Sequence, residues 1–94
     1  MLGQRIGELR TALGWSQVTL AQRIGVTKQT VSNWENENIQ PSIEMLVRLA
    51  KLFNVSTDYL LGLENTPRLN IDGLEKHVIA HISQLIDDFR RSSI

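Results

Sequence analysis

The feature that most constrains this chain is a predicted corner between residues 17 and 36, where two short amphipathic segments meet at Gly25. In the first segment, Leu20, Ala21 and Ile24 recur at helical spacing and therefore share one face that must be buried. Glycine tolerates the left-handed backbone that commonly ends a helix. The sequence therefore predicts that the first helix stops at Gly25 and that the chain turns sharply there.

The second segment repeats this pattern with Val31 and Trp34 on its inward face. Thr27 can cap this helix with its hydroxyl group, and Val26 can enter the core between the two helices. Ala21 has only a methyl group, so the second helix can cross close over the first. Two helices that cross at about 120° around a glycine turn are typical of a helix-turn-helix unit.

Length and composition limit the chain to a single small domain that is not stabilised by disulfides or thiolate-bound metal. The sequence has 94 residues, 41% of them hydrophobic, and no cysteine, which excludes disulfides and thiolate metal sites. It has no 18-residue apolar run and no charged segment followed by an apolar stretch at its start. We therefore expect a cytoplasmic protein that has no membrane partner and needs no cofactor.

Further helical patterns flank the corner, and they complete an all-α domain of five helices over residues 1–62. Gly14 ends the first helix, and Ser16 caps the second. The apolar positions of the first helix are Leu2, Ile6, Leu9 and Leu13. Those of the fourth helix, which Pro41 and Ser42 precede and Asn54 closes, are Ile43, Leu46, Leu49, Ala50 and Phe53. A short fifth helix, residues 58–61, stops at Gly62.

After this domain we expect a linker over residues 63–70 and one amphipathic helix over residues 71–94. Asp72 to Glu75 resembles a capping box at the start of this helix. Its apolar face is predicted to make a homodimer through Ile71, Leu74, Val78, Ile82, Leu85 and Phe89. This face can also fold back on its own domain, but pairing with a second copy is favoured because the five-helix domain already has a core and two-fold dimers are the commonest oligomers.

The outward face of the helix over residues 27–35 carries the side chains suited to reading DNA. Its members are Thr27, Lys28, Gln29, Ser32 and Asn33. The amides of Gln29 and Asn33 match the hydrogen-bonding edge of adenine in the major groove, and Lys28 can donate to guanine. We therefore expect these five residues to contact base edges.

The apolar positions of the corner, together with Ala21 and Gly25, match a helix-turn-helix signature position for position. In this region, and over residues 2–62 as a whole, the chain resembles the Cro/C1-type family of phage and bacterial repressors. The resemblance implies a lambda-repressor-like fold with Lys28, Gln29 and Asn33 at base-reading positions. It also implies a phosphate contact for Gln17. Lys28 and Asn33 differ from the glutamines of one well-known repressor, so the target sequence does not carry over.

Phosphate contacts are expected around this helix rather than on it. The start of the second helix offers unpaired backbone N–H groups, and the loop after residue 35 is polar. The candidates are Ser16, Gln17, Arg10, Asn36, Asn38 and Gln40. The resemblance implies that Arg10 first pairs with Glu35 and only secondarily binds phosphate. Because the net charge is zero, a positive patch must arise from placement, and we expect Arg5, Arg10, Arg23 and Lys28 on one side.

Signals for other kinds of site are weak. His77 and His81 lie one helical turn apart, as paired metal ligands do, and Asp88 lies two turns further on, but a third ligand is not assured. We therefore predict no metal site. The sequence has no G-x-S-x-G motif, no phosphate-binding glycine loop and no cysteine nucleophile, and so we expect no enzyme.

These observations predict a sequence-specific regulator of transcription that binds double-stranded DNA as a homodimer and acts as a repressor. The alternative is an antitoxin-like or regulatory protein-interaction module, which would bind a protein partner through the C-terminal helix and DNA only secondarily.

Overall fold

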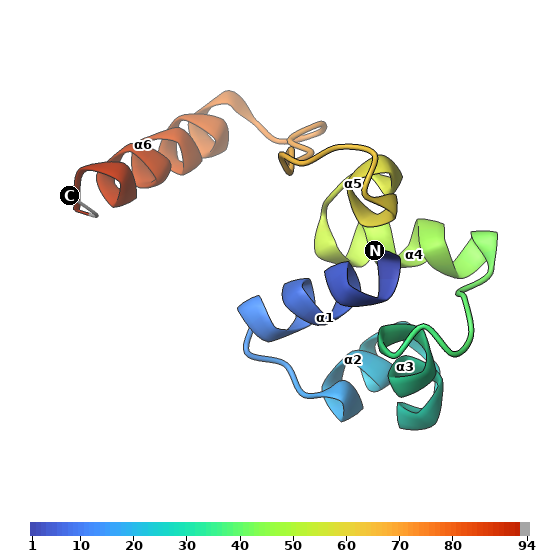
Figure 1. The fold of residues 1–94 in the computed structure, drawn as a ribbon. Helices are drawn as coiled ribbons and strands as arrows, with labels where there is room; N and C mark the ends of the chain where they lie inside the picture. The colour runs from blue at the N-terminus through green and yellow to red at the C-terminus, as the bar shows by residue number, and fades with distance from the viewer. Residues whose placement is uncertain (93–94) are drawn as a thin grey trace.

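The computed structural model describes residues 1–92, which fold into six helices and contain no strand (Figure 1). The helices are α1 (Leu2–Ala12), α2 (Gln17–Ile24), α3 (Lys28–Glu35), α4 (Ile43–Phe53), α5 (Thr57–Leu61) and α6 (Lys76–Ser92). The all-α class predicted from the sequence is confirmed, including five short helices before residue 62. Residues 93 and 94, at the end of the predicted C-terminal helix, lie outside the described residues.

Side-chain caps begin four of the five short helices. In each, a hydroxyl oxygen accepts a hydrogen bond from the backbone N–H three residues later, as at Ser16 and Thr27, the residues predicted to cap α2 and α3. Ser42 and Ser56 do the same for α4 and α5. At the predicted corner, Gly25 has a φ of 81°, and its N–H donates to the Ala21 carbonyl oxygen. Local signals in the sequence therefore place these helix boundaries.

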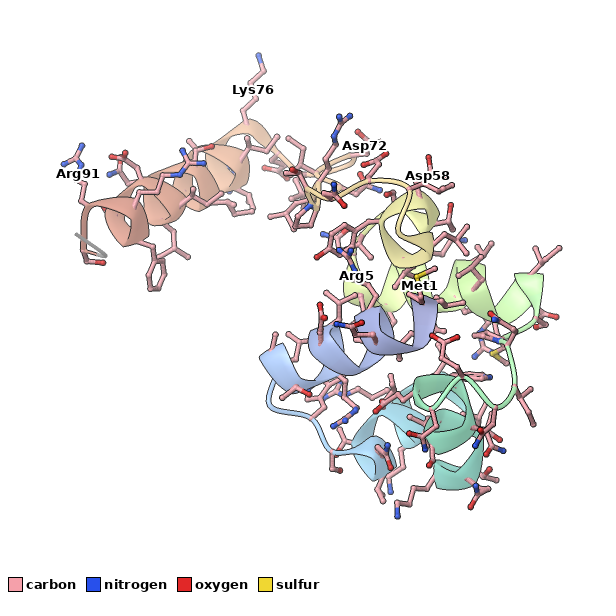
Figure 2. All side chains as sticks on the ribbon, in the orientation of Figure 1. Met1, Arg5, Asp58, Asp72, Lys76 and Arg91 are labelled. Atoms are coloured by element: carbon pink, nitrogen blue, oxygen red, sulfur yellow. The ribbon has the colours of Figure 1, made fainter. Side chains whose placement is uncertain are left out.

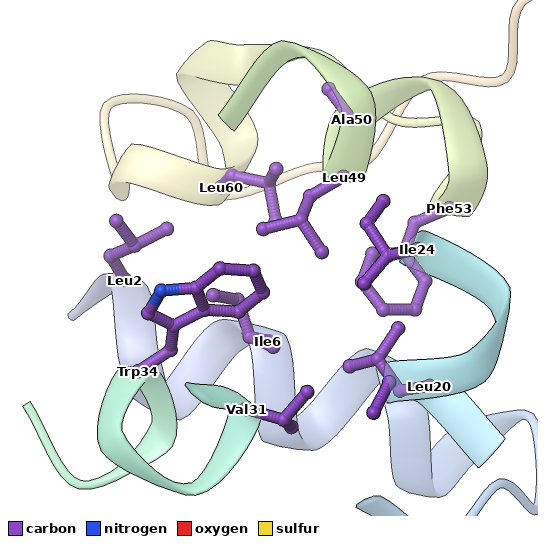
Figure 3. Packing of buried hydrophobic residues seen from close by; sticks show 11 residues of the cluster. Leu2, Ile6, Leu20, Ile24, Val31, Trp34, Leu49, Ala50, Phe53 and Leu60 are labelled. Atoms are coloured by element: carbon purple, nitrogen blue, oxygen red, sulfur yellow. The ribbon is translucent and has the colours of Figure 1, made fainter. Parts of the chain in front are cut away.

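The first five helices enclose one apolar core and form the head of the molecule, residues 1–62. In the head, α1 packs against α3 and α5, α2 packs against α3 and α4, and α4 also packs against α5. Figure 3 shows the Trp34 ring reaching from α3 towards Leu2 and Ile6 of α1. The buried core residues are Leu2, Ile6, Leu20, Ala21, Ile24, Val31, Trp34, Leu49, Ala50, Phe53 and Leu60.

Two residues expected on buried faces are exposed. Leu13 is 52% exposed because α1 ends at Ala12, so Leu13 already belongs to the turn. Ile43 is 82% exposed. It is the first residue of α4, and at about 100° per residue it lies at the edge of the buried arc, beyond Ala50. The sequence-based prediction was wrong for both side chains.

The segment between the head and α6 is longer than predicted, because α6 begins at Lys76 and not at residue 71. Gly73 has a φ of 82°, which interrupts helical backbone, and the Asp72 N–H bonds to the side-chain oxygen of Asn70 instead of entering a capping box. Asn70 also exchanges two hydrogen bonds with Asn54 at the end of α4, at 3.3 and 3.4 Å. Ile71 and Leu74 therefore precede the helix.

Helix α6 lies apart from the head at the far end of this segment (Figure 1). None of its described residues is fully buried. Among the described residues, no helix is both long and apolar enough to cross a membrane.

Candidate nucleic-acid interface

Helices α2 and α3 form the corner that holds the candidate interface. The inward residues of α3, Val31 and Trp34, are 0% and 4% exposed, and they fix this helix against α1 and α2. The Arg48 guanidinium donates to the Ile24 carbonyl oxygen at 2.9 Å, which satisfies a carbonyl at the end of α2. The orientation of α3 is therefore set from both sides of the corner.

The outward face of α3 carries the polar residues that the sequence placed there. Thr27, Lys28 and Gln29 are exposed, while Ser32 and Asn33 are half-buried. The Gln29 side-chain nitrogen donates to the Asn33 side-chain oxygen at 3.1 Å, so the two amides form one unit. The Gln29 oxygen and the Asn33 nitrogen keep their capacity to accept and donate. An acceptor and a donor side by side match an adenine edge.

The hydroxyl groups of Thr27 and Ser32 already form hydrogen bonds within the protein. The Thr27 hydroxyl oxygen accepts from the Thr30 N–H at 3.2 Å, and the Asn36 side-chain nitrogen donates to the Ser32 hydroxyl oxygen at 3.3 Å. In this geometry, Lys28, Gln29 and Asn33 are the side chains of α3 best able to reach a base.

The Glu35 carboxylate joins three helices at the edge of the interface. It accepts two hydrogen bonds from the Arg10 guanidinium, at 2.7 and 3.0 Å, and one from the Gln17 amide at 3.1 Å. The third Arg10 nitrogen donates to the Trp15 carbonyl oxygen at 2.8 Å. The side chains of Arg10 and Glu35 are only 17% and 11% exposed. Arg10 thus has the structural role that the resemblance implied, and its phosphate contact stays a prediction.

This ion pair also acts on the protonation of Arg10. The hydrogen bond that the guanidinium donates to Glu35 and, to a lesser extent, the charge of Glu35 raise the pKa of the guanidinium, while burial opposes the shift. Arg10 therefore stays charged at every pH at which the protein can be studied.

The Gln17 contact with Glu35 was not foreseen, because the two residues are 18 positions apart and the sequence has no local signal for their pairing. Gln17 is the first residue of α2, directly after Ser16, whose hydroxyl oxygen caps Thr19 at 3.0 Å. The hydrogen bond to Glu35 therefore fixes the start of α2, where Ser16 and Gln17 are predicted to contact phosphate.

The loop after α3, residues 36–40, carries the remaining phosphate candidates. Asn36, Asn38 and Gln40 are exposed. The loop backbone is tied to α3, because the N–H groups of Asn38 and Ile39 both donate to the Asn33 carbonyl oxygen, at 2.9 and 3.3 Å.

A second unforeseen contact joins this loop to α1. Glu37 has a φ of 61°, and its carboxylate accepts from the Gly3 N–H at 2.7 Å. A side chain at residue 3 would overlap the Trp34 carbonyl oxygen, so only glycine allows this approach. The acidic side chain is thus held at the start of α1, where a helix N-terminus favours negative charge.

The basic residues expected on one side are held by different partners. Arg5 lies over the Tyr59 ring, 3.9 Å from its centroid, between α1 and α5 (Figure 2). Arg23 lies 4.4 Å from the Trp15 ring centroid, and Arg10 is held by Glu35. Arg10 and Arg23 therefore both contact Trp15, whereas Arg5 lies between α1 and α5. Lys28 remains on the face of α3.

The predicted dimer residues within α6 form a partly exposed apolar face. Val78 and Ile82 are half-buried, whereas Leu85 and Phe89 are 55% and 65% exposed. His77 and His81 face each other at the N-terminal half of α6, with ring centroids 6.4 Å apart. Across residues 1–92, no three histidine, aspartate or glutamate side chains gather in a way that could hold a metal ion.

Comparison with known proteins matches residues 6–60 to the helix-turn-helix family, which spans the corner and the core of the head. The chain belongs to that family. It is 35% identical over 88 residues to the HTH-type transcriptional regulator ImmR of Bacillus subtilis (strain 168), an alignment that covers 93% of this chain and 69% of ImmR. The family type predicted from the sequence, Cro/C1-like, is thereby confirmed.

The solved structures that resemble this helix-turn-helix protein include a repressor bound to DNA. The P22 c2 repressor in complex with a synthetic operator superposes with a TM-score of 0.61 and 35% identity, covering 64% of this chain and 91% of the repressor chain. The SinR protein/SinI protein complex gives a TM-score of 0.61 and 28% identity, covering 98% of this chain and 99% of the matched chain. The first likeness is to a head bound to DNA, and the second extends through α6.

Proposed function

We propose that this protein is a sequence-specific regulator of transcription that binds double-stranded DNA as a homodimer and represses by occupying its operator. The observation that carries the proposal is the outward amide pair of Gln29 and Asn33, 3.1 Å apart, beside exposed Lys28 on a helix held rigidly by Val31 and Trp34. The P22 c2 repressor, a structural relative, was solved with a synthetic operator.

In this proposal α3 enters the major groove, and its side chains divide the work of binding. Gln29 and Asn33 read an adenine, and Lys28 donates to a neighbouring guanine or to a phosphate. Ser16 and Gln17 at the start of α2, and the amides of the loop 36–40, contact the DNA backbone. These backbone contacts are mostly uncharged, which suits a chain with a net charge of zero and predicts a shallow dependence of affinity on salt.

The second copy supplies the second recognition helix. A single head offers few base contacts, whereas two heads joined through α6 bind two half-sites about one helical turn, or about 34–36 Å, apart. The second contact is then effectively intramolecular, which raises affinity without new contacts. A dimer seated on a promoter blocks polymerase by occupying its site.

The alternative places a regulatory protein on α6 and makes DNA binding secondary. SinR, which resembles this chain over nearly its whole length, was solved in complex with the SinI protein. Sedimentation of the purified protein separates the two functions. A homodimer supports the proposal, and a monomer that assembles only with a second polypeptide supports the alternative.

The proposal is tested by selecting bound fragments from random duplex DNA and titrating variants against the selected operator and a scrambled duplex. Gln29→Ala should weaken operator binding by about 1–3 kcal/mol and leave scrambled binding nearly unchanged, because base contacts carry the discrimination. The matched control is Gln22→Ala, which removes an exposed glutamine from α2 and should change neither affinity.

Equal losses of Gln29→Ala on both duplexes would contradict the base-reading role of α3. Lys28→Ala has two informative outcomes. A salt slope lower by about one unit identifies a phosphate contact, and an unchanged slope with altered base preference identifies a base contact.

A further inference from the structure

The apolar face of α6 is bordered by two unlike edges. At about 100° per residue, its apolar side chains fall within about 120° of arc. They are Val78, Ile79, Ile82, Leu85, Ile86 and Phe89. Ile79 and Ile86 form one edge of this face, and His81 and Asp88 lie along the opposite edge.

The symmetry of a helix pair decides which edges meet. When two identical helices pair antiparallel about a two-fold axis, each edge meets the same edge of the other helix. When they pair in parallel, each edge meets the opposite edge. Because the two edges of α6 differ in character, the two arrangements differ in stability.

The antiparallel arrangement matches side chains of like or complementary chemistry. Ile79 then lies opposite Ile86 of the second copy, twice in each dimer, and extends the apolar contact. On the other edge, His81 lies opposite Asp88 of the second copy, where an imidazole N–H can donate to a carboxylate oxygen. Asp88 accepts one bond from Gln84 of its own helix at 3.0 Å, and its carboxylate has room for more acceptor contacts.

The parallel arrangement lacks this match. It places Ile86 beside His81 of the second copy, so an apolar edge meets a polar one, and it gives Asp88 no basic neighbour among the described residues. Leaving apolar surface against a polar edge forfeits part of the burial that would drive association.

The length of α6 favours the same arrangement. The helix has 17 residues, and at a rise of about 1.5 Å per residue it is about 25 Å long. Figure 2 labels Lys76 and Arg91 at its two ends. In an antiparallel pair the two Lys76 ends, from which the segments to the heads depart, lie about 25 Å apart. In a parallel pair they lie only about 8–10 Å apart. The larger separation is closer to the distance between half-sites.

We infer that α6 pairs antiparallel with α6 of a second copy, about a two-fold axis that passes between Ile82 and Leu85. This inference rests on the proposed homodimer and adds its orientation and register. Ile79 contacts Ile86 of the second copy, and His81 contacts Asp88 of the second copy.

Cysteine crosslinking of the full chain tests the orientation without background, because the sequence has no cysteine. The double variant Ile79→Cys, Ile86→Cys brings the two thiols together only between antiparallel chains. Within one helix the two positions are about 10 Å apart, too far for a disulfide. Val78→Cys reports the parallel pair, because in the antiparallel pair its two copies lie about 16 Å apart along the axis.

Under mild oxidation we expect the double variant to form a covalent dimer on a non-reducing gel and Val78→Cys to remain unlinked. Crosslinking of Val78→Cys in place of the double variant would overturn the antiparallel orientation while leaving the homodimer intact. A wild-type dimer in sedimentation with neither variant crosslinked would move the interface away from α6. A wild-type protein that sediments as a monomer would contradict both the antiparallel orientation and the proposed homodimer.

Charge variants test the register of the polar edge. His81→Lys should tighten the dimer about tenfold and His81→Glu should loosen it similarly, because each dimer contains two pairs with Asp88 and an exposed pair is worth a few-fold in affinity. The same substitutions at Ala80, an exposed residue on the side of α6 opposite the apolar face, are the control and should leave the dimer Kd unchanged. Equal effects at both positions would contradict the register.

Discussion

The head and α6 are both built from amphipathic helices, yet only the head buries its apolar faces. Leu20, Leu49 and Leu60 of the head have no exposed surface. In α6, by contrast, Leu85 and Phe89 are more than half exposed and no described residue is fully buried. The difference separates a unit that buries its own apolar side chains from a helix whose apolar face stays partly exposed.

The two regions also differ in how their helices are stabilised. The helices of the head have 5–11 residues, which is short for an isolated helix, so they depend on capping hydroxyl groups and on packing against one another. Helix α6 has 17 residues and carries support on its own surface, including the Asp87 and Arg91 ion pair at 2.8 Å. A helix supported locally can stand away from the core and offer its apolar face to a second chain.

The largest expected effect comes from the centre of the head. Leu20→Ala should lower the free energy of unfolding of the head by about 2–5 kcal/mol, because it removes buried methyl groups and leaves a cavity. Trp15 and Trp34, the two tryptophans of the chain, both lie in the head, so their fluorescence in urea follows the head alone. Leu85→Ala on α6 is the matched control and should leave this transition unchanged. Similar losses in both variants would mean that the head and α6 unfold as one unit.

The next effect tests the charged link between the helices of the corner. Glu35→Ala should cost about 3 kcal/mol, because it leaves the nearly buried Arg10 guanidinium without its partner. Glu35→Gln, which keeps the shape and one acceptor oxygen, should cost less. Urea unfolding measures both variants. A neutral result for Glu35→Ala would show that Arg10 is solvated and available for phosphate.

A smaller effect is expected where α1 passes close to α3. Gly3→Ala should cost about 1–3 kcal/mol, because the new methyl group overlaps the Trp34 carbonyl oxygen and lies 2.8 Å from a Glu37 carboxylate oxygen. Gly7→Ala on the same helix is the control. Its methyl group would approach Glu35 at 3.3 Å, and the higher helix propensity of alanine offsets this strain. Thermal unfolding distinguishes them, and equal midpoints would argue against the close approach at Gly3.

The smallest effect concerns the exposed start of α4. Ile43→Ser should change the free energy of unfolding by less than about 0.5 kcal/mol, because 82% of the isoleucine is exposed. A loss of unfolding free energy comparable with that of Leu20→Ala would mean that Ile43 belongs to the core, as its spacing in the sequence suggested.

The parts of the head that follow local rules could be predicted from the sequence. The caps at Ser16 and Thr27, the left-handed Gly25 and the buried Val31 and Trp34 each depend on residues a few positions apart. The outward face of α3 follows from the same periodicity, because a helix with two buried positions presents its other side to solvent.

Contacts between distant residues could not be predicted in this way. Gly3 and Glu37 are 34 positions apart, and their hydrogen bond depends on how closely α1 approaches α3. Arg5 was expected on the DNA-facing side, but an aromatic ring on α5 holds it elsewhere. The start of α6 was misplaced because Asp72 and Glu75 have the spacing of a capping box, while Gly73 between them adopts a left-handed backbone that a helix does not continue.

The most direct test of the central claim compares residues 1–70 with the full chain on the operator that the full chain selects. We expect the shorter protein to retain its tryptophan fluorescence and cooperative unfolding, to sediment as a monomer, and to bind the operator at least about a hundredfold more weakly, because the second head is no longer tethered. A shorter protein that remains a dimer with undiminished operator affinity would contradict the claim. The dimer interface would then lie in the head, and α6 would have another purpose.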